Sequence, residues 1–197
     1  MGNAVKHKVT KDDIIWYSKK VSQTKVKCEI QPSKLAGWLK RQGFGLYHTS
    51  KNNINLNDAD LIVRIEDGKI ERVDKHALSK YIIRFYRDLP PKLFEGKNPL
   101  ALKMYSGTTA PDTFSLDDVM DRLSKNNLIT DGLLQMMSDY DDNNPQQFLD
   151  DKHNVYIPFN NKIIHITKDF IGTMEWNEAK GVVWKDNIQD WNINLLS

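Results

Sequence analysis

The stretch 154-NVYIPFNNKIIHITKDFIGTMEWNEAKGVVWKDNIQD-190 holds the clearest local structure in this sequence of 197 residues. It opens with two runs of β-branched and aromatic residues that are separated by two asparagines. Asparagine tolerates the positive φ of a two-residue type I′ turn, so this pattern predicts a β-hairpin. In that register Ile157 lies opposite Ile164, and Tyr156 lies opposite His165. We expect the isoleucine face to be buried and the Tyr156 face to be half exposed.

A second hairpin is predicted around Asp67-Gly68, which two further β-rich runs flank. An Asp-Gly pair is a strong short-range hairpin signal because both central positions of a type I′ turn need positive φ. The resulting register places two pairs of opposite charge on one face: Arg64 with Glu71, and Glu66 with Lys69. A strand over residues 44–48 is expected to precede this hairpin.

Helices are predicted where a capping residue precedes apolar residues at helical spacing. One expected helix follows Thr10, with Ile14, Ile15 and Tyr17 apolar, and a second begins at Pro32, with Leu35, Trp38 and Leu39 inward. A third follows Asp74, with an inward stripe of Leu78, Tyr81, Ile82, Phe85 and Leu89. Two more helices are expected after Ser115 and Thr130. The lysine-rich stretch 21–29 is expected to be extended or loose.

These elements predict an α+β fold, in which a small β-hairpin-plus-helix module is followed by a helical segment and a second β-hairpin. The expected division is a basic module at residues 1–92, a linker or loop at 93–114, and a helical segment with the C-terminal hairpin at 115–197. The middle segment is chosen because it is rich in Gly, Pro and Thr.

The composition is typical of a globular protein, with 40% hydrophobic and 27% charged residues. The sequence has neither a run of about 18 apolar residues nor an apolar signal core at its N-terminus, so we expect no membrane partner and a cytoplasmic location, in the host cell if the protein is viral. Cys28 is the only cysteine, which excludes an intramolecular disulfide and a thiolate metal cluster.

The net charge of +2 conceals a strong asymmetry along the chain. Residues 1–103 hold 21 Lys and Arg against 11 Asp and Glu, whereas residues 104–197 hold 7 against 15. A basic half suits a polyanion, because each neutralised phosphate releases counterions. The alternative is that the two halves simply attract one another within one fold.

Two stretches resemble the region just upstream of the ATPase module in phage superfamily 3 helicases of the primase-helicase type. The C-terminal match is carried by Asn160, Ile164, Ile166, Thr167, Lys168, Asp169, Gly181, Val183, Trp184, Lys185 and Ile188. The other match covers residues 43–89, so that about half the chain is included. The resemblance implies a phage DNA-replication protein whose non-catalytic collar region guides DNA, with a homo-oligomer or a helicase or primase as partner. The chain would then be either a fragment of a longer helicase or a separate replication accessory.

The candidate nucleic-acid site consists of cations in the N-terminal part: Lys19, Lys20, Lys25, Lys27, Lys34, Lys40 and Arg41. They surround Trp16, Tyr17 and Trp38, and cations interleaved with aromatic residues suit single-stranded DNA, whose phosphates bind by charge and whose bases stack. Trp38 lies on an apolar stripe, so we assign the binding role to the cations.

Two alternatives remain open. An acidic site at Asp139, Asp141 and Asp142 would make the chain a small metal-dependent nuclease, whereas exposed tryptophans at Trp176, Trp184 and Trp191 would make it a protein-binding adaptor. The acidic loop departs from a calcium-binding loop at several positions, so we expect no metal. No phosphate-binding loop is present, because residues 95–98 imitate only its tail and Pro99 follows. We therefore expect no catalytic residues and no cofactor.

Overall fold

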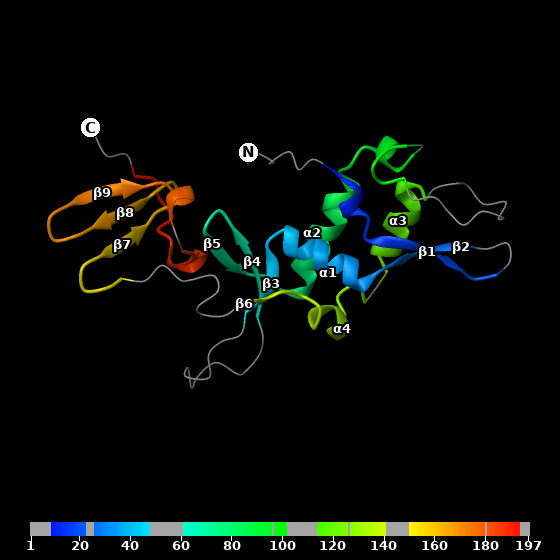
Figure 1. Cartoon of the computed structure of the whole chain (residues 1–197), viewed down its shortest axis with the longest axis horizontal. Helices are drawn as coiled ribbons and strands as arrows, with labels where there is room; N and C mark the ends of the chain where they lie inside the picture. Colours follow the sequence, from blue (N-terminus) through cyan, green and yellow to red (C-terminus); the bar gives the residue numbers. More distant parts are fainter. Residues whose placement is uncertain are drawn as a thin grey trace. The chain divides into compact units, whose positions relative to one another are not determined.

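The computed structural model describes residues 9–22, 26–47, 61–95, 97–101, 114–125, 127–140, 150–179 and 181–193. The chain forms two compact units that are interleaved in sequence, as Figure 1 shows by colour. Unit 1 comprises Met1–Arg41 and Asp74–Met137, and unit 2 comprises Gln42–Val73 and Ser138–Ser197. This division differs from the sequential one that the sequence predicted. The hairpin around Asp67-Gly68 belongs with C-terminal strands, whereas the helix that follows it belongs with N-terminal elements.

Unit 1 is a group of helices with a two-stranded antiparallel ribbon. Its elements are η1 (Lys11–Asp13), β1 (Trp16–Lys20), β2 (Val26–Ile30), α1 (Pro32–Arg41), α2 (Lys75–Arg87), η2 (Pro91–Phe94), α3 (Leu116–Leu123) and α4 (Asp131–Leu134). Among the described strands β1 pairs only with β2, and α3 packs against β2. The ribbon is labelled beside α3 in Figure 1.

The core of unit 1 is aromatic. Trp38 of α1 contacts Phe85 and Tyr86 of α2, with ring centroids 4.9 and 5.6 Å apart. Trp16, at the start of β1, stacks on Phe94 at 5.7 Å and meets Tyr86 edge to face at the same distance. Trp16 and Trp38 are fully buried. The base of the ribbon is therefore anchored in the same cluster that joins the two longest helices.

The predicted helix caps of unit 1 are confirmed at three positions. The Asp74 carboxylate accepts a hydrogen bond from the amide of Ala77 at 2.7 Å, Ser115 forms a capping box, and the Thr130 hydroxyl accepts from the Leu133 amide at 3.1 Å. Thr10 also forms its capping box, but only a 3-10 turn follows it. The predicted helix there is wrong, because the chain enters β1 at Trp16. The lysine-rich stretch is extended at Val26–Ile30, as one of its two predicted forms, and is paired there with β1.

The larger sheet of unit 2 has five strands in the order β10-β5-β4-β3-β6. They are β3 (Phe44–Tyr47), β4 (Leu61–Glu66), β5 (Lys69–Arg72), β6 (Asp139–Tyr140) and β10 (Val183–Trp184). The predicted hairpin and its register are confirmed, since Arg64 lies opposite Glu71 and Glu66 lies opposite Lys69 on the neighbouring strand. Its turn has the positive φ values expected at Asp67 (49°) and Gly68 (73°).

The smaller sheet of unit 2 contains the C-terminal hairpin and one unpredicted strand, in the order β7-β8-β9. Its strands are β7 (Val155–Pro158), β8 (Ile163–Ile166) and β9 (Ile171–Met174). The register is confirmed, and Tyr156 stacks on His165 with ring centroids 4.7 Å apart. The two asparagines of the turn are not among the described residues with positive φ, so the type I′ turn is wrong at this position.

The expected core face of that hairpin is also wrong. Ile163 is fully buried and packs with Trp176, Val183 and Ile188, and Tyr156 packs against the same cluster. These contacts put the Tyr156 face inward. The opposite face remains partly open, with Val155 exposed by 41% and Ile171 by 70%. Both faces are apolar in sequence, so the packing partner selects which one is buried.

Within the described part of the chain, no helix has the length and apolar character needed to cross a membrane.

Candidate nucleic-acid interface

The β1–β2 ribbon presents a basic face to solvent. Alternate residues of a strand share a face, so Tyr17 and Lys19 of β1 lie on the same side as Lys27 and Glu29 of β2. Lys19 is the direct cross-strand partner of Lys27, and Tyr17 is the partner of Glu29. Tyr17 is 38% exposed, and both lysines are exposed.

The opposition of Lys19 and Lys27 is unfavourable in the free protein. Directly opposed residues of an antiparallel pair have Cβ atoms about 4.5–5.5 Å apart, and like charges at such positions destabilise the pairing. An anion between the two ammonium groups would convert this repulsion into two attractions. The ribbon therefore has an electrostatic reason to hold a negatively charged ligand.

Glu29, the one acidic side chain among the described residues of this face, is already paired. The Nε atom of Arg122, on α3, lies 2.8 Å from Oε2 of Glu29. Both side chains are about one-quarter exposed. Because Arg122 offsets the charge of Glu29, the face as a whole keeps a positive balance.

The other face of the ribbon is structural. It carries Trp16 and Cys28, and the thiol is partly buried. Burial raises the pKa of the Cys28 thiol to about 12, and the negative charges of Asp118 and Glu29 act in the same direction. The thiol is therefore neutral at physiological pH and is a poor nucleophile.

The structure brings together only some of the predicted cations. Lys19 and Lys27 lie on the basic face of the ribbon, whereas Lys20 is exposed on the opposite face, across from Val26, and Lys25 lies outside the described residues. Their convergence could not be read from the sequence, because the predicted N-terminal helix and loose segment would separate them.

The cations of α1 do not form a comparable cluster. Lys34 and Lys40 are exposed but lie six residues apart, which separates them by about 120° around the helix axis. Arg41 donates hydrogen bonds to the carbonyls of Gly37, at 3.2 Å, and of Asp12. Arg41 therefore links α1 to η1, and its role within the fold was not predicted.

The charge asymmetry follows the two units more closely than it follows the order of the chain. Unit 1 carries 19 Lys and Arg against 11 Asp and Glu, whereas unit 2 carries 9 against 15. The basic ribbon thus belongs to the positively charged unit. A polyanion would be attracted to unit 1 and repelled by unit 2.

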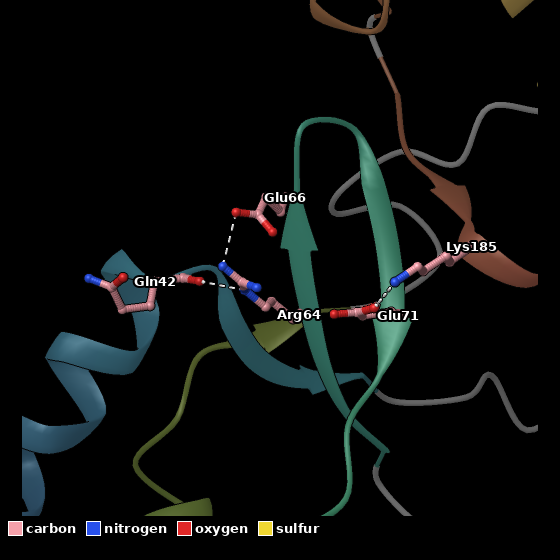
Figure 2. Close-up of polar contacts among 5 residues, drawn as sticks. All are labelled: Gln42, Arg64, Glu66, Glu71 and Lys185. Carbon is pink, nitrogen blue, oxygen red and sulfur yellow. Dashed lines mark hydrogen bonds and ion pairs between the residues drawn. The ribbon is translucent and has the colours of Figure 1, made fainter. Parts of the chain in front are cut away.

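Arg64, Glu66 and Glu71 of the β4–β5 hairpin take part in ion pairs. Figure 2 shows Arg64 between the Glu66 carboxylate, at 3.0 Å, and the Gln42 carbonyl, at 3.4 Å. On the next strand Glu71 pairs with Lys185 at 2.6 Å, which ties β5 to the segment after β10. These contacts hold strands together, so this cluster is structural.

A hollow of about 520 Å³ lies in unit 2, lined by Asp67, Gly68, Lys69, Asn161, Glu175, Trp176, Asn177 and Ala179. Lys69 lies over the Trp176 ring at 4.7 Å and donates to the Asn160 carbonyl at 3.1 Å. Glu175 pairs with Lys162 at 3.0 Å. These two lining charges therefore serve the fold.

The acidic site of the nuclease alternative can be placed only in part. Asp139 is exposed in β6, while Asp141 and Asp142 lie outside the described residues. Among the residues that are described, no group of three or more His, Cys, Asp or Glu side chains could hold a metal ion.

The prediction of three exposed tryptophans is wrong for two of them. Trp176 is buried and its indole donates to the Phe159 carbonyl at 3.0 Å. Trp184 is half-buried and meets Tyr47 at 5.3 Å. Only Trp191 is well exposed, by 66%. The first two fill the unit 2 core, because indole rings bury large apolar areas.

Comparison with protein-family models, with curated proteins and with solved structures found no match.

Proposed function

We propose that this chain is a non-catalytic DNA-handling module of a phage replication apparatus, which holds single-stranded DNA through the basic ribbon of unit 1. The observation that carries the proposal is the direct opposition of Lys19 and Lys27 on an exposed face. Opposed lysines are costly for folding, and an anionic ligand supplies the compensating interaction.

The surrounding chemistry supports the same ligand. Tyr17 lies two residues from Lys19 on the same face, so an aromatic ring and a pair of cations are presented together. Proteins that bind single strands combine a positive groove for the phosphates with aromatic rings on which bases stack. The net positive charge of unit 1 adds long-range attraction to the local contacts.

The resemblance to the region upstream of a superfamily 3 helicase motor also supports this function. Such a region lies on the path of the strand, and a homo-oligomer or a helicase or primase partner would multiply the weak contacts of one protomer. The two resembling stretches contribute paired strands to one sheet, since β10 runs parallel to β5. Their residues are therefore scaffold in this proposal, and the ligand is held by unit 1.

The test is fluorescence anisotropy with a labelled single-stranded oligonucleotide at about 50 mM salt, where phosphate contacts are little screened. The variant combines Lys19→Glu and Lys27→Glu, which reverse the two opposed lysines of the ribbon. The matched control combines Lys152→Glu and Lys168→Glu, which reverse exposed lysines of unit 2. We expect binding by the wild type and the control, and none by the ribbon variant. Arg41 is left intact because its hydrogen bonds serve the fold.

The adaptor alternative is favoured by one observation, the open apolar face of the smaller sheet. Val155 and Ile171 are exposed there, and Trp191 is exposed elsewhere in unit 2. If the wild type binds no DNA at about 50 mM salt, the positive charge of unit 1 serves an acidic protein partner, and the adaptor function takes precedence.

A further inference from the structure

We infer that the ribbon face formed by Tyr17, Lys19 and Lys27 is the contact surface, and that its ligand is an extended single strand with one phosphate bridged between the two lysines and an adjacent base stacked on Tyr17. This inference rests on the proposed function, and it adds how the strand lies on the ribbon and what each of the three side chains does.

The bridging role follows from the register. Because Lys19 and Lys27 are direct cross-strand partners, their side chains leave the ribbon side by side. Each ammonium has three donors, and a phosphate offers several acceptor oxygens, so one phosphate can accept from both lysines. No described residue of opposite charge pairs with either lysine across the ribbon, since Glu29 faces Tyr17 and is held by Arg122.

The stacking role follows from the position of Tyr17. It is the next residue along β1 on the same face as Lys19, so the two side chains stand about 6.6 Å apart along the strand. A base attached beside the bridged phosphate can therefore reach the ring. Tyr17 is also separate from the buried aromatic cluster, in which Trp16 points to the opposite side of the ribbon.

A single strand fits this face better than a duplex does. A base can stack on Tyr17 only if one of its faces is free, whereas a paired base is covered by its neighbours in the duplex. Stacking is tolerant of sequence, because every base has a π face. We therefore expect little sequence preference.

The decisive variants are Lys27→Glu and Tyr17→Ala, compared with Lys34→Glu/Lys40→Glu on α1. Lys27→Glu places opposite charges across the ribbon at Lys19, so the melting temperature should not fall while single-strand affinity drops by about tenfold or more. Tyr17→Ala should weaken single-strand binding about fivefold or more and leave the salt slope unchanged. The α1 control should bind within about twofold of the wild type, because its cations lie outside the contact surface.

The outcomes separate the inference from the function on which it rests. If the wild type binds no single strand, the proposed function itself fails. If the wild type binds, and the α1 variant loses binding while the ribbon variants retain it, the site lies on α1, so the inference is overturned, and of the proposed function only the binding of single strands stands. If a duplex of the same length binds as tightly and Tyr17→Ala has no effect, the ribbon enters a groove and the single-strand assignment is wrong.

Discussion

Two glycines of unit 2 share a left-handed backbone but differ in the space around them, which allows a sharp test of the fold. Gly68 has φ +73° at the tip of the β4–β5 hairpin, and a Cβ there would meet its nearest neighbour, in Trp176, at 3.5 Å. Gly43 has φ +83°, and a Cβ there would lie 2.1 Å from the Ile65 carbonyl oxygen. Gly43 and Ile65 are joined by a backbone hydrogen bond of 2.8 Å.

Gly68→Ala should therefore cost only the strain of a left-handed residue, about 1–2 kcal/mol. Gly43→Ala should cost this strain and also force the β4 backbone away, for a total of more than about 3 kcal/mol. Urea unfolding monitored by circular dichroism, with amide hydrogen exchange at Ile65 and Lys69 as the local readout, measures both values. Equal losses at the two positions, or no loss at Gly43, would refute the close approach of β3 and β4.

Three further outcomes are expected. Trp38→Ala should cost about 3–5 kcal/mol in urea unfolding because it empties the aromatic core of unit 1, whereas Trp191→Ala should cost under about 1 kcal/mol. Because the pKa of Cys28 is raised, the folded state keeps a proton on this thiol between pH 9 and about 12, whereas the unfolded state loses it. The free energy of unfolding should therefore fall as the pH rises through that window, and Cys28→Ser should flatten this fall. Melting should be unchanged by Ca²⁺, Mg²⁺ or Mn²⁺, and micromolar binding that disappears in Asp139→Ala would instead favour the nuclease.

The elements that could be predicted from the sequence are those fixed by local chemistry. Asp67-Gly68 sets a hairpin because few other residues accept its backbone angles. Asp74 and Ser115 each start a helix because their side chains accept a hydrogen bond from an amide in the first turn. Such signals depend on neighbours within a few residues, so no knowledge of the rest of the fold is needed.

The elements that were missed depend on contacts far along the chain. The β1–β2 ribbon is rich in lysine, which hides the alternation of its two faces, and its inner face is defined by Trp16 packing on Tyr86 and Phe94. The buried face of β7 and β8 depends on Trp176, because either face would have been apolar enough. The interleaved units likewise arise from pairing between distant strands.

The candidate site was only partly predictable, because its residue types are visible in the sequence but its distant contacts are not. The cations and their aromatic neighbours are visible in the sequence, but the opposition of Lys19 and Lys27 requires the register of the ribbon. The role of Arg41 requires the approach of α1 to η1. Residue type therefore indicated the chemistry, and only the fold showed which side chains act together.

The salt dependence of single-strand binding is the most direct test of the central claim, because each phosphate contact contributes a log-log slope of about −0.7. The wild type should show a slope of about −0.7 or steeper, and Lys19→Glu/Lys27→Glu should bring both the slope and the affinity close to zero while leaving melting nearly intact. The unit 2 control Lys152→Glu/Lys168→Glu should keep the wild-type slope. A wild-type affinity that does not change with salt, or an equal loss in both double variants, would contradict the assignment of the ribbon as the phosphate-binding face.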